Sequence, residues 1–518
     1  MRKSTLKRLA LVLSAVLLAT TLSSCGGNSG NISREEYDRL VEENDALNKR
    51  LGEPSVTIIS DGDTLLYDNS PPIGWPENDA DDFEYKAVAG GIEISKYVGT
   101  TIKVRIPEKI EGVAVTSIGD SAFKNTGIME AYIPNSVTNI GNSAFEGNEG
   151  LVSLTIPVAV KNIGSSAFSG SALTSIALPS KDTSIGANAF SDCVALRSVS
   201  IPEGVSSIGN GAFSGCTSLT SVTIPNSVTS LGEENQDRNR TRALGVFSGC
   251  TSLKSVTIGN GVSSLGIANS DYDDYNERDG FGKGFFFGCT ELSSVVIGNN
   301  VAVLGNFSFA GCTSLVSLVI PDSVTTIGNY AFLGSGLSII DIGNGVIEIY
   351  RSAFAGTGLT SVSLPSGLTS IGDNAFAGVK LESISIPDSV EKIGRSAFAG
   401  TGLSSVTLGN GVQSIGYNAF AGTGLTSIAI PDSVKSIEND AFRCVYEYSL
   451  NLPWENNPFT GTTHSGTTAA YGTVHTSCQL CGGTFALSVY YKGKTYDVTL
   501  DEYSGVCVLP QEFYRAFW

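Results

Sequence analysis

The sequence predicts a β-rich solenoid, because one short motif recurs along most of the chain. The repeat is marked by fourteen phenylalanines: Phe123, Phe145, Phe168, Phe190, Phe213, Phe247, Phe286, Phe309, Phe332, Phe354, Phe376, Phe398, Phe420 and Phe442. They are 22 or 23 residues apart, except for two steps of 34 and 39 residues that indicate insertions before Phe247 and Phe286. A unit this short cannot bury its own apolar face, so about 14 units must stack on one another.

Each unit contains one predicted strand followed by a turn. In one unit, Leu219, Val222 and Ile224 alternate with polar residues, which is typical of a strand with one buried edge. A proline or glycine follows the strand in nearly every unit, as Pro225 does here, and permits the turn. Stacking should place the phenylalanines in one buried column of rings in contact. The outward strand positions are mostly Ser and Thr, so we expect a flat lattice of hydroxyls on this face.

The consensus I-P-x-S-V-x-x-I-G-x-x-A-F-x-G-C-x-x-L-x-x-V resembles the BspA-type leucine-rich repeat of bacterial surface antigens. The segment from Gly90 to Gly119 also resembles the opening unit of such arrays. The resemblance implies a leucine-rich repeat array whose role is adhesion to host proteins, mucosal surfaces or other bacteria. Tyr350 and Glu438 replace the glycine of the turn, and there we expect a shifted backbone or the approach of the array's end.

The chain divides into six predicted segments around this array. They are a lipoprotein signal peptide (1–24), a flexible tether (25–32), a short coiled-coil-like helical stalk (33–52), a linker (53–82), the leucine-rich repeat solenoid with its N-terminal cap (83–445), and a C-terminal segment that includes a small β-element (446–518).

The N-terminus predicts export. Basic residues precede an apolar run from about Leu9 to Ala19, which is short for a membrane span and typical of a signal peptide. The sequence from Leu22 to Gly26 resembles the lipobox of bacterial lipoproteins, and the resemblance implies cleavage before Cys25 and lipidation of its thiol. The alternative is an ordinary signal peptide with an incidental cysteine. We therefore expect a membrane-anchored lipoprotein on the bacterial cell surface.

The predicted stalk has apolar residues at coiled-coil spacing. The seam positions, which recur in steps of three and four residues, are Tyr37, Leu40, Asn44, Leu47 and Leu51, and Asn44 is the polar one. Two to three heptads are marginal in isolation. Residues 33–52 could form a weak homodimer or serve as a solitary spacer helix.

Five consecutive units carry a cysteine three residues after the phenylalanine: Cys193, Cys216, Cys250, Cys289 and Cys312. Adjacent rungs of a stack lie about 4.8 Å apart, but parallel side chains hold their Cβ atoms slightly too far apart for easy bridging. We expect a ladder of buried free thiols.

The C-terminal segment holds both histidines of the chain, His464 and His475, close to Cys478 and Cys481. Two histidines and a Cys-x-x-Cys pair could bind zinc, although the spacing does not match a common zinc finger. A disulfide between the two cysteines, or simple thiols, are equally compatible with the sequence.

The two insertions are candidate partner-binding loops, because insertions in a repeat array commonly mark a binding face. Both fall after the turn glycine and before the phenylalanine, so they should emerge from one edge. The first contributes Arg238, Arg240 and Arg242, and the second contributes Tyr272 and Tyr275. Acidic residues of the second loop could hold calcium, but their order does not match an EF-hand. The alternative is that both loops are simply solvated.

The composition argues for a binding protein without an enzymatic function or a required cofactor. The net charge of −18 disfavours a nucleic-acid partner, which needs a clustered basic face. The array contains no histidine to act as a general base. Extracellular proteins or glycans are therefore the expected partners. A carbohydrate-binding surface module, or a structural spacer that displays the C-terminal segment, are the alternatives to an adhesin.

Overall fold

The computed structural model describes residues 74–442, apart from 180–181, 233–244, 269–283, 426 and 439. Outside this range it describes six strands: β1 (Ile58–Asp61), β2 (Thr64–Tyr67), β33 (Ser488–Tyr491), β34 (Lys494–Asp497), β35 (Thr499–Asp501) and β36 (Val506–Val508). The chain divides into two units, Met1–Pro72 and Ile73–Trp518. In the first unit, β1 and β2 form an antiparallel hairpin. The predicted stalk at 33–52 lies outside the described residues.

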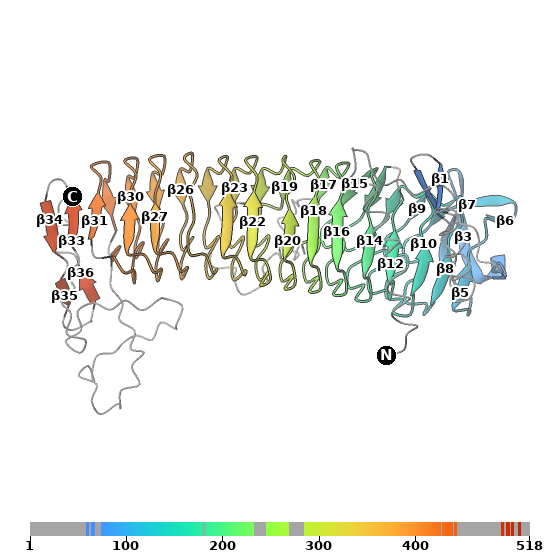
Figure 1. The fold of residues 1–518 in the computed structure, drawn as a ribbon. Helices are drawn as coiled ribbons and strands as arrows, with labels where there is room; N and C mark the ends of the chain where they lie inside the picture. The colour runs from blue at the N-terminus through green and yellow to red at the C-terminus, as the bar shows by residue number, and fades with distance from the viewer. Residues whose placement is uncertain are drawn as a thin grey trace, which may run out of the picture. The chain divides into compact units, whose positions relative to one another are not determined.

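The second unit contains a solenoid whose turns contribute to two rows of strands, although the turn around 359–364 has no row 1 strand and row 1 is divided into several short parallel sheets (Figure 1). Row 1 comprises β5 (Lys103–Arg105), β8 (Glu130–Tyr132), β10 (Ser153–Thr155), β12 (Ser175–Ala177), β14 (Ser198–Ser200), β16 (Ser221–Ile224), β18 (Ser255–Ile258), β20 (Ser294–Val296), β22 (Ser317–Ile320), β24 (Ile339–Ile342), β27 (Ser383–Ser385), β29 (Ser405–Thr407) and β31 (Ser427–Ile430). The predicted strand at Leu219–Ile224 is thus present as β16, and its residues alternate between exposed and buried as expected.

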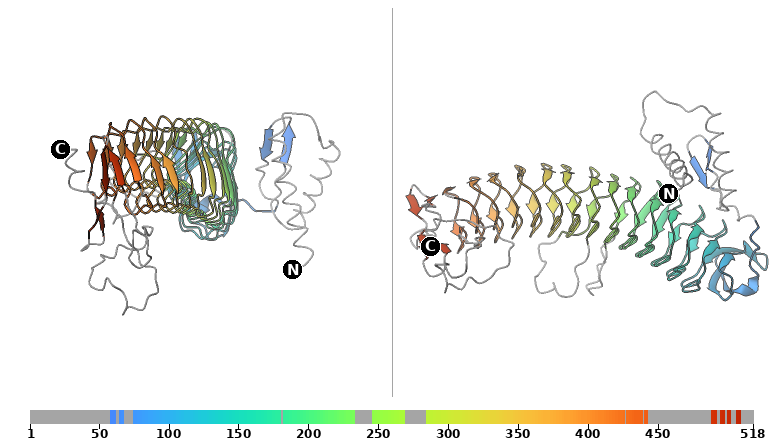
Figure 2. Two further views of the ribbon diagram at one scale, coloured as in Figure 1. Left: turned by 60° about the vertical axis from the view of Figure 1, so that its left-hand side comes forward. Right: turned by 60° about the horizontal axis from the view of Figure 1, so that its bottom comes forward.

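Row 2 was not predicted. It comprises β7 (Val113–Ile118), β9 (Asn139–Ile140), β11 (Asn162–Ile163), β13 (Thr183–Ile185), β15 (Val205–Ile208), β17 (Ser230–Leu231), β19 (Ser264–Leu265), β21 (Val303–Leu304), β23 (Thr326–Ile327), β25 (Glu348–Ile349), β26 (Ser370–Ile371), β28 (Lys392–Ile393), β30 (Ser414–Ile415) and β32 (Ser436–Ile437). Most of these strands have only two residues, which is too short for an alternating pattern to appear in the sequence. They form because each turn pairs with its neighbours, and Figure 2 shows these turns from two further directions.

The predicted phenylalanine column is confirmed. Successive rings stack nearly parallel, with centroids 4.8–5.7 Å apart and interplanar angles of 1–18°. The column begins one ring earlier than predicted, with Tyr97, whose ring lies 5.4 Å from that of Phe123. The Tyr97 hydroxyl donates to the carbonyl oxygen of Thr101 at 3.0 Å. A polar aromatic residue thus closes the column where it meets the cap.

The first cap is built from an antiparallel hairpin. It contains η1 (Ala80–Asp82), β3 (Phe83–Val88) and β4 (Gly91–Tyr97), and β6 (Lys109–Ile110) pairs with β7 nearby. β4 joins row 2 through β7, so β3 covers what would be the open edge of that row. At the other end, β33 pairs in parallel with β31, and β34 pairs with β33. β33 and β34 therefore extend row 1, whereas β35 and β36 form a separate antiparallel pair.

Glycines set how closely successive turns approach. A Cβ atom on Gly164 would lie 2.5 Å from the carbonyl carbon of Gly141, one unit earlier. Tyr350 occupies an equivalent position, but its amide still donates to Ile327 at 2.9 Å, as Gly328 does to Leu304 at 2.7 Å. The Glu438 amide keeps the same bond at 2.9 Å in the last described unit. The hydrogen bond of the turn is therefore kept at both positions, and Glu438 lies where the array approaches its end, which was one of the two outcomes expected there.

Both insertions leave the solenoid at equivalent positions, as predicted. Gly232 and Gly266 end the described turns with positive φ angles of 67° and 96°. Row 2 is interrupted here, between β17 and β19. Phe285 stands where most units have alanine. Its ring packs against both glycines, and only 5% of the residue is exposed. Phe285 thus fills the gap that the insertions open in the ladder.

Candidate binding surface

The outward side chains of row 1 form the most regular exposed surface of the solenoid. Alternate residues of each strand point into the core, so the remaining two face outward. In the second half of the array these outward residues are Ser221 and Thr223, Ser255 and Thr257, Ser294 and Val296, Ser317 and Val319, Ile339 and Asp341, Ser361 and Ser363, Ser383 and Ser385, Ser405 and Thr407, and Ser427 and Ala429. The predicted hydroxyl lattice is present, but it has exceptions.

Apart from Ala429 on β31, the exceptions among these residues cluster on three neighbouring strands. Val296 on β20, Val319 on β22, and Ile339 and Asp341 on β24 replace Ser or Thr. Ile339 and Val319 are the most exposed large hydrophobic residues of the described chain, at 65% and 64%. Sequence reasoning missed them because each looks ordinary within its own strand. Only alignment of the outward column across units makes the four departures visible.

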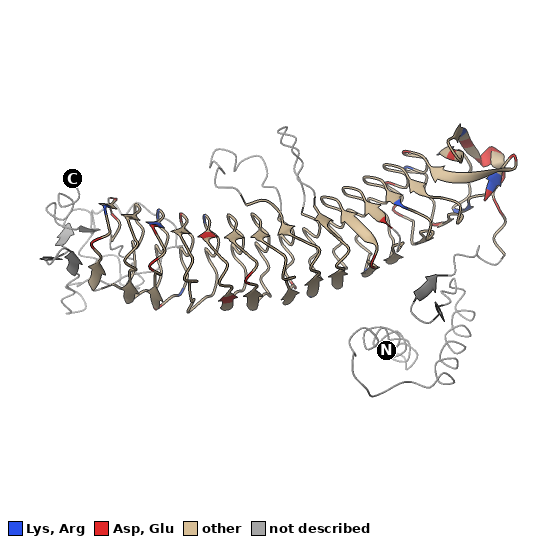
Figure 3. Cartoon of the chain, turned by 90° about the horizontal axis from the view of Figure 1, so that it is seen from above, with Lys and Arg blue, Asp and Glu red and all other residues tan. Residues whose placement is uncertain are grey.

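Charge is sparse around this cluster. Between Gly204 and Ile340 the described residues include only three charged side chains, Lys254, Glu291 and Asp322. Lys254 and Glu291 approach each other to 3.7 Å and are both more than half exposed. Figure 3 shows that few of the described residues of this stretch are acidic or basic, whereas such residues are more frequent toward the cap. The described residues in the middle of the array therefore carry little charge, whereas the two insertions within this stretch, which lie outside the described residues, are rich in charged side chains.

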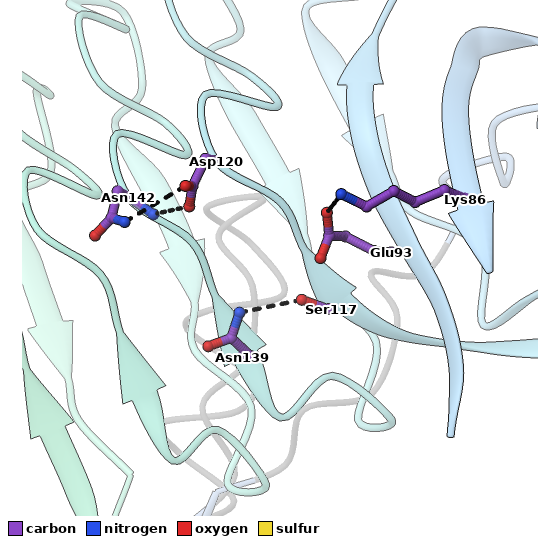
Figure 4. A network of polar contacts seen from close by, with 6 residues as sticks. All are labelled: Lys86, Glu93, Ser117, Asp120, Asn139 and Asn142. Carbon is purple, nitrogen blue, oxygen red and sulfur yellow. Dashed lines mark hydrogen bonds and ion pairs between the residues drawn. The ribbon is translucent and has the colours of Figure 1, made fainter. Parts of the chain in front are cut away.

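Other polar side chains of the repeat serve the scaffold. The Asn142 amide nitrogen of the main chain donates to Asp120 Oδ1 at 2.7 Å, and Asn139 Nδ2 donates to Ser117 Oγ at 3.1 Å (Figure 4). The recurrent serine before valine donates to a valine carbonyl one unit earlier, as Ser227 does to Val205 at 2.8 Å. Asn142 and Ser227 form their bonds at corners between units, and Asn139 and Ser117 join the side chains of the paired strands β9 and β7. These groups are therefore poor candidates for ligand contact.

The five array cysteines are free and fully buried, as predicted. Each thiol donates to the carbonyl oxygen of the phenylalanine in the preceding unit, at 3.1–3.3 Å. Burial raises the pKa of Cys193 to about 11 and that of Cys289 to about 12. Thiols that stay protonated at neutral pH are weak nucleophiles and weak metal ligands. The cysteine ladder is part of the core rather than a reactive site.

All of the site residues predicted from the sequence lie outside the described residues. They are Cys25, Arg238, Arg240, Arg242, Tyr272, Tyr275, His464, His475, Cys478 and Cys481. Their proposed roles in lipidation, partner binding and zinc binding remain predictions. The described part of the chain contains no helix of the length and hydropathy that a membrane span requires. It also contains no group of three or more His, Cys, Asp or Glu placed to hold a metal ion.

Comparison with known proteins places these features in a family. The profile described as "BspA type Leucine rich repeat region" matches six copies within residues 116–239, 280–401 and 369–465, which is more than half of the chain. No curated protein matches the sequence.

Several solved structures are similar. A leucine-rich repeat protein from Bacteroides ovatus ATCC 8483 is 25% identical over 69% of this chain and 95% of its own, with a TM-score of 0.44. A leucine rich cell surface protein from Faecalibacterium prausnitzii A2-165 is 25% identical over 66% and 96%, with a TM-score of 0.36. The T. pallidum leucine rich repeat protein is 27% identical over 46% and 91%, with a TM-score of 0.31.

Proposed function

The chain belongs to the family of BspA-type leucine-rich repeat proteins, and on that premise we propose that it is a non-enzymatic, adhesin-like protein of the bacterial cell surface. Its solenoid holds a binding face for host or bacterial surface proteins. Lipidation of Cys25 anchors the chain to the membrane, and the tether and stalk project the array away from it. The two insertions, with their arginines and tyrosines, contribute to partner contact.

The observation that carries this proposal is the outward face of row 1. It runs along strands that are held in register by parallel pairing, as between β16 and β18 or β27 and β29. Its outward side chains are not used by the core. A rigid, extended surface of this kind suits a protein partner, because contacts can be distributed over several units without ordering a flexible segment.

Binding of extracellular-matrix proteins and glycan arrays to the full chain tests the proposal. Three proteins should be compared: the full chain, a variant lacking 233–243 and 269–283, and a variant in which Cys25 is replaced by Ser. Binding to defined proteins, reduced by loop deletion, is the expected result. Binding to glycans alone would favour a carbohydrate module, and no binding at all would favour a structural spacer.

The Cys25→Ser variant addresses the anchor separately. In bacteria that process the wild-type chain, metabolic labelling with a clickable fatty acid should mark the wild type and leave the variant unlabelled. Equal labelling of both proteins would contradict lipidation at Cys25. Because ligand binding is measured on purified protein, this result does not affect the binding test.

A further inference from the structure

We infer that Val296, Val319, Ile339 and Asp341, hereafter the central patch, form a docking site for a protein segment that presents a Lys or Arg beside aliphatic or aromatic side chains. This inference rests on the proposed binding function and specifies the partner's chemistry. The patch spans three consecutive strands of row 1, β20, β22 and β24, near the middle of the array (Figure 1).

The fold does not require these residues. Their positions face outward, and the same positions hold Ser or Thr in β16, β18 and β29 without loss of the ladder. Burial would account for a large aliphatic residue, but the side chains of Val296, Val319 and Ile339 are 55–65% exposed. Clustered exposed apolar residues in a soluble surface mark sites of interaction.

The strand register brings the four side chains together. Ser317 lies opposite Ile339, and Val319 lies opposite Asp341, so Val319 and Ile339 are diagonal neighbours on one face. Diagonal neighbours in a sheet are about 7–8 Å apart, within reach of one bound side chain. Val296 holds the position in β20 that Val319 holds in β22 of the next unit, and both side chains are exposed, although no backbone pairing joins these two strands. The residues come from three repeats, yet they form one surface.

Asp341 defines the charge of the partner. It is the only charged residue among the outward positions from β14 to β31 that the structure describes. No ion pair or hydrogen bond joins its carboxylate to another described residue. A carboxylate beside an apolar surface matches a cation carried next to an apolar group, since the contact excludes water from both.

The charge and the side-chain types of the patch argue against other occupants. A second copy of the patch would bring Asp341 toward its equivalent or leave it buried without a partner, and either arrangement is unfavourable. An anionic membrane would require basic residues, which the patch lacks. A sugar ring is commonly held by a planar aromatic side chain, and the outward positions of β20, β22 and β24 carry none. A basic and apolar segment of a protein fits best.

The test is selection of phage-displayed random peptides on the full chain, with counter-selection on the Val319→Ser/Ile339→Ser variant. These substitutions restore the residue type of the neighbouring units, and because both sites are exposed they should leave folding unchanged. Thr407→Ser, in the same outward column on β29, is the matched control.

The expected peptides carry Lys or Arg next to an aliphatic or aromatic residue. They should bind the control like the wild type and bind the Asp341→Asn variant about tenfold more weakly, with affinity falling as salt is added. The inference is overturned if no peptide distinguishes wild type from the double variant, or if the selected peptides lack basic residues and ignore Asp341→Asn. Matrix proteins that bind the double variant like the wild type would also overturn it, while leaving the proposed binding function intact.

Discussion

The thiol of Cys250 donates a hydrogen bond to the main-chain carbonyl oxygen of Phe213, one unit earlier, at 3.1 Å. The same slot holds Thr in later units, where Thr401 donates to the carbonyl oxygen of Phe398 in its own unit at 2.8 Å. Both residues therefore donate to a phenylalanine carbonyl oxygen, cysteine to that of the preceding unit and threonine to that of its own unit. This equivalence explains why the repeat accepts both residues and why the cysteines need no disulfide.

Replacement of Cys250 tests this role. Cys250→Thr should leave the free energy of unfolding nearly unchanged, because a donor remains in the slot. Cys250→Val removes the donor with little change in volume and should cost about 0.5–1.5 kcal/mol. Urea denaturation followed by circular dichroism measures both. Equal stability of the Val variant and the wild type would show that the thiol hydrogen bond contributes nothing.

The buried thiols also predict a loss of stability in alkali. Burial raises the pKa of Cys193 from its usual value of about 8.5 to about 11, so the folded chain holds the proton more tightly than the unfolded chain. The resulting stability is fully present below about pH 8.5 and is lost as the pH rises toward about 11. Denaturation midpoints measured across this interval should fall. The fall should be smaller in Cys193→Ser, and an identical profile in that variant would contradict the linkage.

The phenylalanine column predicts a large cost for truncation. Phe309 stacks on Phe286 and Phe332 at 5.3 and 5.5 Å and is fully buried. Phe309→Ala should therefore cost about 3–5 kcal/mol. Leu333→Ala, at a neighbouring but 37% exposed side chain, serves as the control and should cost much less. A melting curve of Phe309→Ala that matches the wild type would contradict the column as the core of the array.

The glycine contacts predict a position-specific effect of alanine. In Gly164→Ala the added methyl would meet the Gly141 backbone at 2.5 Å, so neighbouring turns must separate, at a cost of about 1–3 kcal/mol. In Gly150→Ala the nearest atom is Cγ of the exposed Met129 side chain at 3.3 Å, which can move. Thermal unfolding should distinguish the two variants. Similar midpoints would show that the turns are not closely packed at Gly164.

Much of the candidate surface could be predicted from the sequence. The alternation around Val222 predicts that Ser221 and Thr223 face outward, because successive residues of a strand point to opposite sides. The same rule places Val319 and Asp341 outward, but it does not say that they lie opposite one another. Their pairing depends on the register between chain segments 22 residues apart. The loop, lipidation and zinc residues predicted from sequence stay predictions, since they lie outside the described residues.

The sequence by itself determined that this chain is a stack of repeats with a phenylalanine core. A large apolar side chain that recurs every 22 or 23 residues, in units too short to bury it, is buried by contact with its equivalents in adjacent units. Tertiary structure alone decided that Tyr97 begins the ring column, that Phe285 fills the gap at Gly232 and Gly266, and that the central patch forms one surface. These contacts join residues from different units. They are set by how the turns pack, and no local pattern in the chain records that packing.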